Sequence, residues 1–176
     1  MELIYTIVAF AVCFFVLIAV HEFGHFLAGW AGGVPARNMK IRLLVFPQRV
    51  LLRDGDRWVS PLDIGPYVTV MRRYLTTLPK CYLYVAGGLL SETLFSSATS
   101  VAFVELGWLT FAFLVAFSTL IHYIAYLVLL DLPMALWNGR ASGDFSGLWS
   151  MAKIPTVMLV TGLFAVQALL LWYATR

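Results

Sequence analysis

Two histidines and a glutamate stand close together in the sequence HEFGH at positions 21–25. On a helix His21 and His25 are four residues apart, so both imidazoles project from one face and can bind one metal ion. Glu22 lies beside that face, where its carboxylate can take a proton from water without being a ligand of the metal. The spacing therefore predicts a metal-dependent hydrolytic site on one helix.

Zinc suits this pattern, because catalytic zinc sites combine imidazole nitrogens and a third protein ligand with one position left for water. Bound zinc lowers the pKa of that water and polarises a carbonyl group. HEFGH follows residues 3–20, which contain no Asp, Glu, Lys or Arg. If the helix continues to about Trp30, His21 lies roughly 13 Å before its end, a depth at which ionisable side chains are costly and usually functional. The alternative is that the motif only forms hydrogen bonds with neighbouring helices.

The composition indicates that lipid is part of the solvent. The chain has 176 residues, of which 61% are hydrophobic and only 12% charged, and its mean hydropathy is +0.87. A soluble domain of this length could not bury so much apolar surface, whereas a helix of roughly 20 apolar residues crosses a membrane. We therefore expect one domain over residues 1–176, an all-α polytopic membrane protein whose first segment remains as a permanent span. Four stretches are long enough to cross, at about 3–29, 81–104, 106–130 and 154–174.

Basic residues are concentrated between the first two predicted spans. Residues 31–80 hold nine of the twelve Lys and Arg residues, against three acidic residues. By the positive-inside rule this loop faces the cytoplasm, which places the N-terminus outside and HEFGH near the cytoplasmic side. Lys and Arg beside spans usually set orientation, so no nucleic-acid partner is expected.

The same loop, at about 34–75, changes from helical to β-type periodicity. Asp54-Gly55 is flanked by alternating runs at 49–53 and 56–60, which is a strong signal for a β-hairpin. Residues 40–46 supply a further candidate strand. Because these strands are apolar, we expect a small sheet that lies against the membrane or the helices, after a first helix that ends at Gly32-Gly33.

Small residues and a proline give further expectations later in the chain. Gly87-Gly88 and the run at 96–100 place small side chains in the second span, where they let helices approach closely. Leu132-Pro133 should end the third span, and a turn should follow at 138–144. The next segment, from Phe145, is apolar enough to enter the membrane interface.

Two histidines need a third protein ligand, and topology narrows the choice. Glu105 lies on the opposite side of the membrane from HEFGH. Glu92 and His122 lie inside their spans, where interhelical hydrogen bonds or a polar path for water are the favoured roles. Asp131 and Asp144 follow the third span on the correct side, and their spacing alone does not separate them.

The order of these features resembles the site-2 protease family of intramembrane zinc metalloproteases. HEFGH is followed by Gly33-Val34-Pro35, by a basic β-rich loop ending in SPLDIGPYV at 60–68, and by AGGLLSE at 86–92. In the family the loop commonly ends in a PLGGYV-like run and the second core helix carries an AGPxxN-like run. The third core helix carries NxxPxxxxDG, whose Asp is the third zinc ligand. The resemblance covers about residues 10–150.

The third motif departs from the family pattern. Asp131-Leu132-Pro133 stands where the family has its Asn and Pro, and Gly143-Asp144 has the reverse order of the family's DG. The resemblance implies that Asp144 is the third zinc ligand, with Asp131 as the runner-up. The alternative for Asp144 is a helix N-cap in front of the apolar run that follows it. Ser91 stands where the family has the Asn of its second helix.

Residues and resemblance together predict an intramembrane zinc metalloendopeptidase that cleaves a transmembrane or membrane-proximal segment of a protein substrate. Glu22 is the expected general base toward water and then the donor to the leaving amine. A substrate helix must unwind, and we expect an edge of the 40–60 sheet to hold the extended segment by strand addition. Since no other domain is predicted, a separate membrane partner is expected to recognise any regulatory signal.

Two other functions fit parts of the sequence. Some zinc transporters also carry paired His and Glu on a span, and Glu92, His122 and Asp131 could extend an ion path. Four spans and one helix with the required spacing count against that function. A catalytically inactive protein of the same fold that binds membrane partners would explain the altered third motif, but the intact Glu22 counts against it. The oligomeric state stays open.

Overall fold

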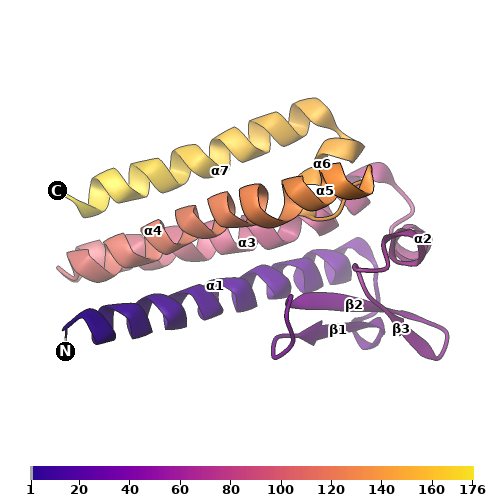
Figure 1. The fold of residues 1–176 in the computed structure, drawn as a ribbon, viewed down its shortest axis with the longest axis horizontal. Coiled ribbons are helices and arrows are strands. Elements are labelled where there is room, and N and C mark those ends of the chain that lie inside the picture. Colours follow the sequence, from indigo (N-terminus) through magenta and orange to yellow (C-terminus); the bar gives the residue numbers. More distant parts are fainter. Residues whose placement is uncertain (1) are drawn as a thin grey trace.

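The computed structural model describes residues 2–176, and most of them are helical. Four long helices lie side by side, and a small sheet and the short helices gather at one end of the bundle (Figure 1). The long helices are α1 (Glu2–Gly32), α3 (Leu78–Glu105), α4 (Leu109–Ala125) and α7 (Lys153–Ala174). Gly33 follows α1 with a positive φ of 115°, so the predicted end of the first helix is confirmed.

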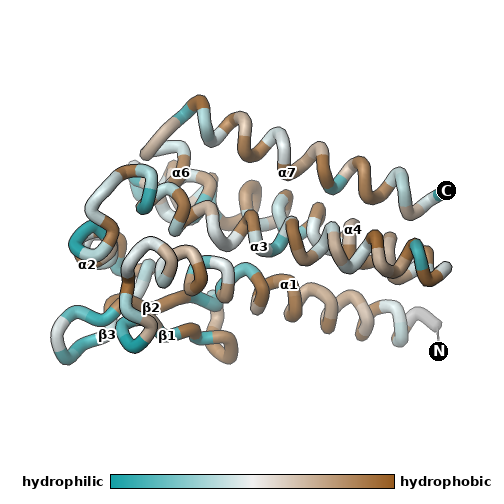
Figure 2. Tube along the Cα trace, turned by 180° about the vertical axis from the view of Figure 1, so that it is seen from behind, coloured by the Kyte–Doolittle hydropathy of each residue, from teal (hydrophilic) through white to brown (hydrophobic). Residues whose placement is uncertain are grey.

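Three helical segments are long and apolar enough to cross a membrane: Ile4–Gly32, Leu109–Asn138 and Lys153–Ala174. A helical protein with segments able to cross a membrane is therefore supported, but the predicted number of four spans is not confirmed. Helix α3 covers the predicted stretch at 81–104, but it is the least apolar of the four long helices. Its polar residues Glu92, Thr93 and Ser96 are buried inside the bundle. Hydrophilic residues gather around the sheet and the helix beside it (Figure 2).

The sheet has three antiparallel strands in the order β1-β2-β3, which are Met39–Arg42, Arg49–Asp54 and Arg57–Val59. The predicted hairpin is confirmed, because Asp54 pairs with Arg57 around Gly55, whose φ is 61°. Strand β1 covers only the beginning of the candidate strand at 40–46 and is preceded by the short 3-10 helix η1 (Ala36–Asn38). The hairpin turn chemistry was thus a better guide than the apolar run.

Helix α2 (Ile64–Tyr74) corrects the prediction of a β-rich loop at 34–75. Its buried residues, Val70 and Met71, join Val50 and Leu52 of the sheet in one apolar cluster. The spacing of Tyr67, Val70 and Met71 at i, i+3 and i+4 is the helical signal in this stretch. Pro61 and Pro66, which are typical of strand ends and turns, favoured the wrong prediction of a β-rich loop.

The prediction that Leu132-Pro133 ends the third span is wrong. Helix α4 continues through the π-helical turn η2 (Tyr126–Asp131) into α5 (Leu132–Asn138), which ends at Gly139 with a φ of 62°. A proline ring clashes with the carbonyl four residues earlier in an α-helix, and here the residues directly ahead of Leu132-Pro133 form a π-helical turn instead of an α-helical one. The predicted turn at 138–144 then leads into α6 (Asp144–Met151).

Helices α1 and α3 contact each other through glycines. A Cβ on Gly24 would overlap the carbonyl oxygen of Gly87, and a Cβ on Gly87 would lie 2.6 Å from the Cβ of Ala28. Contacts this close are possible only without side chains, as expected for small residues between helices in lipid. The two backbones therefore touch at the level of the HEFGH motif.

We predict that Gly24→Ala lowers the thermal unfolding temperature in detergent. The added methyl group meets backbone rather than a movable side chain, and overpacking of this kind costs about 1–3 kcal/mol. Gly162→Ala on α7 is the matched control, because no heavy atom lies within 4 Å of its Cβ position. Equal melting temperatures for the two variants would contradict the prediction.

Candidate metal centre

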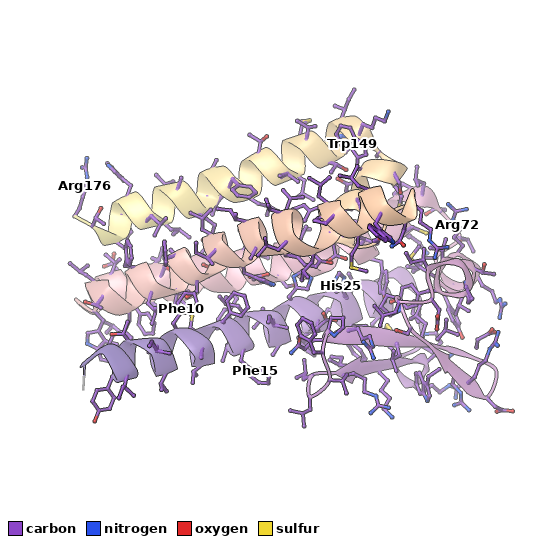
Figure 3. The ribbon with its side chains drawn as sticks, viewed as in Figure 1. Phe10, Phe15, His25, Arg72, Trp149 and Arg176 are labelled. Atoms are coloured by element: carbon purple, nitrogen blue, oxygen red, sulfur yellow. The ribbon has the colours of Figure 1, made fainter. Side chains whose placement is uncertain are left out.

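His21 and His25 on α1 meet Asp144 at the start of α6. The Asp144 Oδ2 atom lies 2.8 Å from His21 Nε2 and 3.3 Å from His25 Nε2, and the two Nε2 atoms are 3.1 Å apart. One ligand atom from each of the three residues lies within 4.8 Å of the others. Figure 3 shows His25 toward the end of α1 that carries the sheet. The group is compact enough to bind one metal ion.

The second ring nitrogen of each histidine is held by α3. His25 Nδ1 lies 2.9 Å from the carbonyl oxygen of Tyr84, which can only accept, so Nδ1 carries a proton and Nε2 is the nitrogen that faces Asp144. His21 Nδ1 lies 3.1 Å from Glu92 Oε2, which gives the same tautomer when Glu92 is ionised. Metal-binding histidines are usually oriented in this way.

Gly88 of α3 leaves the space in front of the two imidazoles open. A Cβ at this position would lie 2.6 Å from the Nε2 atoms of both His21 and His25. The residues thus provide two imidazole nitrogens, one carboxylate oxygen and free space beside them. This donor set fits a catalytic zinc site.

Asp131, the runner-up for the third ligand, has a different position. Its side chain is buried, and Oδ2 accepts a hydrogen bond of 2.9 Å from the backbone N–H of Ser146. The hydroxyl of Tyr126 accepts a further bond of 3.2 Å from the N–H of Asp144. Both acceptors come from η2 and satisfy N–H groups that the first turn of a helix leaves free. Asp131 therefore holds the beginning of α6, which carries Asp144.

The N-cap expected of Asp144 as the alternative is absent. Gly143 occupies the N-cap position and Asp144 is the first residue of the helix. Its carboxylate points instead to the two histidines of α1. The two acids that spacing could not separate are thus distinguished by which of them faces the imidazoles.

The other predicted polar residues lie in three places. Glu92 Oε1 lies 2.7 Å from His122 Nδ1, so the expected interhelical hydrogen bond is present. Glu105 lies at the far end of α3 and accepts a bond of 3.0 Å from the Tyr173 hydroxyl, away from the histidines as expected. Ser91 lies at the α1–α3 contact, where its Oγ would be 2.5 Å from a Cβ on Gly24.

A cavity of about 810 Å³ opens beside the three candidate ligand residues. Glu22 lines it and is only 7% exposed, and its carboxylate makes no hydrogen bond with any residue that the structure describes. Most of the wall is apolar and comes from α1, the η2–α5 segment, α2 and the beginning of β2. The wall includes Phe14, Ile18, Leu129, Leu130 and Met134.

One side of β2 is open where it borders this cavity. Strand β1 pairs with residues 49–52, but β3 pairs only with 52–54. The carbonyl of Val50 accepts a bond of 3.1 Å from the Tyr67 hydroxyl, so the peptide groups of Val50 point away from β1. Desolvation and the adjacent Tyr84 hydroxyl raise the pKa of Tyr67 well above its usual value, which keeps Tyr67 a neutral donor.

Sequence reasoning did not identify Tyr84, Gly88 or Tyr126 as part of this site. Tyr84 acts through its backbone carbonyl, which leaves no signal in the residue type. Gly88 belongs to a small-residue run that indicates helix contact in general. Tyr126 stands four residues after His122 and so shares its helix face, which is the one signal that pointed to it.

Comparison of the chain with protein-family models, with curated proteins and with solved structures finds no match.

Proposed function

We propose that this protein is an intramembrane zinc metalloendopeptidase of the site-2 protease type. The observation that carries the proposal is the convergence of His21, His25 and Asp144 from two helices, with Glu22 beside them on the same cavity. A structural polar cluster would require neither the open space at Gly88 nor an unbonded buried carboxylate.

Each residue has a distinct role in the proposed reaction. His21, His25 and Asp144 would hold a zinc ion, which would polarise the substrate carbonyl and make water acidic enough to react near neutral pH. Glu22 accepts a proton from the attacking water and delivers it to the amine that leaves. The apolar cavity wall excludes bulk water and accommodates apolar side chains of the substrate.

The proposed substrate is an unwound segment of a membrane protein. Strand addition at a sheet edge needs revision in one respect, because β2 is the central strand and only its stretch at 49–51 has an open side. That stretch borders the cavity, so an extended segment paired there would lie beside the ligand residues. The Val50 carbonyl already accepts from Tyr67, so the Val50 N–H is the group that would bind the segment, while the cavity accepts its side chains.

The proposed orientation has four spans, with the N-terminus outside and the active site near the cytoplasmic side. Helix α3 serves as the fourth span, since it runs alongside α1 and α4 and its polar residues face the interior. The basic loop lies at the end of the bundle with the sheet, opposite the beginning of α1 and the end of α7 (Figure 1). This distribution agrees with the positive-inside rule.

Metal transport is less well supported. In the described part of the chain, only one group of three or more His, Cys, Asp or Glu side chains is close enough to bind a metal. A transport path needs successive sites, but among the other candidates Glu92 and His122 are bonded to each other, and Asp131 accepts from the backbone of Ser146. Metal flux into vesicles that depends on His25 would favour transport over proteolysis.

The first prediction from the proposed function distinguishes the general base, Glu22, from the metal ligands. Glu22→Gln should retain zinc but lower the rate of cleavage of a transmembrane substrate by about 10²–10⁴-fold, since it removes only proton transfer. Asp144→Asn should lose zinc as well as activity. Asp131→Asn, which keeps an acceptor for Ser146, should retain zinc. Metal analysis of the purified variants checks this, and full zinc retention in Asp144→Asn would assign the third ligand to another residue.

A second prediction concerns the space in front of the imidazoles. Gly88→Ala should weaken zinc binding strongly, because the methyl group would lie against both Nε2 atoms. Gly147→Ala is the matched control, since its Cβ would lie 3.7 Å from Val85 Cγ1, an ordinary contact. Zinc affinity is measured by competition with a chelator, and equal affinities in the two variants would refute the proposed location of the metal.

A third prediction tests strand addition at the open side of β2. Val50→Pro removes an N–H group that does not face β1, a position at which proline is tolerated in a sheet. Val50→Ala keeps the N–H but loses apolar contact. We expect both variants to bind zinc and Val50→Pro to cleave more slowly than Val50→Ala. Equal cleavage rates would show that the substrate does not pair with this stretch.

A further inference from the structure

We propose that Glu92 is a positioning residue for the metal centre, which orients His21 and is itself held by His122. The inference rests on the proposed zinc site, but not on proteolysis. Neither the HEFGH spacing nor the third ligand requires such a residue, because the same three ligands could form a site with His21 bonded to backbone, as His25 is.

The contacts of Glu92 connect three helices. Its side chain on α3 is fully buried at 0% exposure. One oxygen lies 3.1 Å from His21 Nδ1 on α1, and the other lies 2.7 Å from His122 Nδ1 on α4. Both oxygens are therefore used, and both partners are ring nitrogens.

A fully buried carboxylate is retained only where its partners offset the cost of removing it from water. In a helix that lies in a membrane that cost is high, and such residues are usually functional. A carboxylate on the far nitrogen of a metal ligand fixes the ring orientation and makes the near nitrogen a better donor. Glu92 has this relation to His21, whose Nε2 faces Asp144.

The two histidine ligands differ in how they are held. His25 is bonded to the backbone carbonyl of Tyr84, which the geometry of α3 fixes. His21 depends on a side chain that could turn away, and His122 prevents this by holding the second oxygen of Glu92. The His122 ring in turn packs edge-on against Phe14, with the ring centroids 5.0 Å apart. The order of support thus runs from Phe14 through His122 and Glu92 to His21.

The competing explanation is that Glu92 and His122 only join helices. The chain offers a matched control for this role, because Ser96 and Gln167 form another fully buried polar pair, 3.2 Å apart, between α3 and α7. Among the residues that the structure describes, neither Ser96 nor Gln167 forms a hydrogen bond with His21 or His25. A purely structural role for Glu92 predicts that both pairs affect stability alone.

The test compares zinc affinity with stability in the full-length protein in detergent. Zinc dissociation constants are measured by chelator competition for Glu92→Gln, Glu92→Ala, His122→Ala and Ser96→Ala, with melting temperatures recorded in parallel. We expect zinc binding to weaken by about 10–100-fold in Glu92→Ala, the range typical when a residue that hydrogen-bonds a metal-binding side chain is removed. The loss should be smaller in Glu92→Gln and His122→Ala. Ser96→Ala should keep the wild-type affinity.

Cobalt(II) provides a second readout that is specific for the ligands. Replacing zinc by cobalt should give a visible spectrum that shifts in Glu92→Gln and not in Ser96→Ala. Glu92→Gln has the size of the native residue, so it serves if Glu92→Ala does not fold. Wild-type zinc affinity and an unshifted spectrum in Glu92→Gln would overturn the inference, as would an equal loss of affinity in Ser96→Ala.

The outcomes also separate this inference from the proposed function. If the wild type binds zinc but cleaves no substrate, the protease proposal fails while the affinities of the Glu92 variants still decide the positioning role. If the wild type binds neither zinc nor cobalt, both proposals fail together.

Discussion

The structure depends on the cost of burying imidazoles and carboxylates at the end of an apolar bundle. His21 and His25 are almost fully buried, and α1 cannot supply partners for their rings from its own backbone, which its helical hydrogen bonds already use. Partners must come from other helices: Glu92 and the Tyr84 carbonyl from α3, and Asp144 from α6. A buried polar group without a hydrogen-bond partner costs roughly several kcal/mol of folding free energy. These contacts therefore specify how the helices are arranged.

Glycines make this arrangement sterically possible. The Tyr84 carbonyl reaches His25 only because α1 and α3 touch through Gly24 and Gly87, and the imidazole faces stay open only because position 88 has no side chain. In a soluble core such close contact would be one way among several to bury apolar surface. Between helices in lipid, close contact is itself a main source of association, so the same glycines serve packing and the site.

Local patterns predicted the parts of the fold that a few neighbouring residues determine. The α1 end, the hairpin at Gly55 and the pairing of His21 with His25 follow from turn chemistry and helix periodicity. The course of the chain at Pro133 did not, because a proline normally ends a helix and a π turn has no residue signature. Helix α2 was hidden by prolines, although its apolar residues had helical spacing. Resemblance favoured Asp144 over Asp131, but spacing alone could not, since both acids follow the third span.

The order Gly143-Asp144 has a physical reason in the way η2 holds α6. A Cβ on residue 143 would lie 2.7 Å from the Tyr126 hydroxyl and 2.8 Å from Asp131 Cγ, so this position must be glycine if both groups are to reach the helix. Asp144, one residue later, is clear of that contact and turns to the histidines. Asp131 takes over the support of the α6 N-terminus, a role that would otherwise compete for the Asp144 carboxylate. Gly143 and the buried Asp131 together therefore support the beginning of α6 and leave the Asp144 carboxylate free to face the histidines.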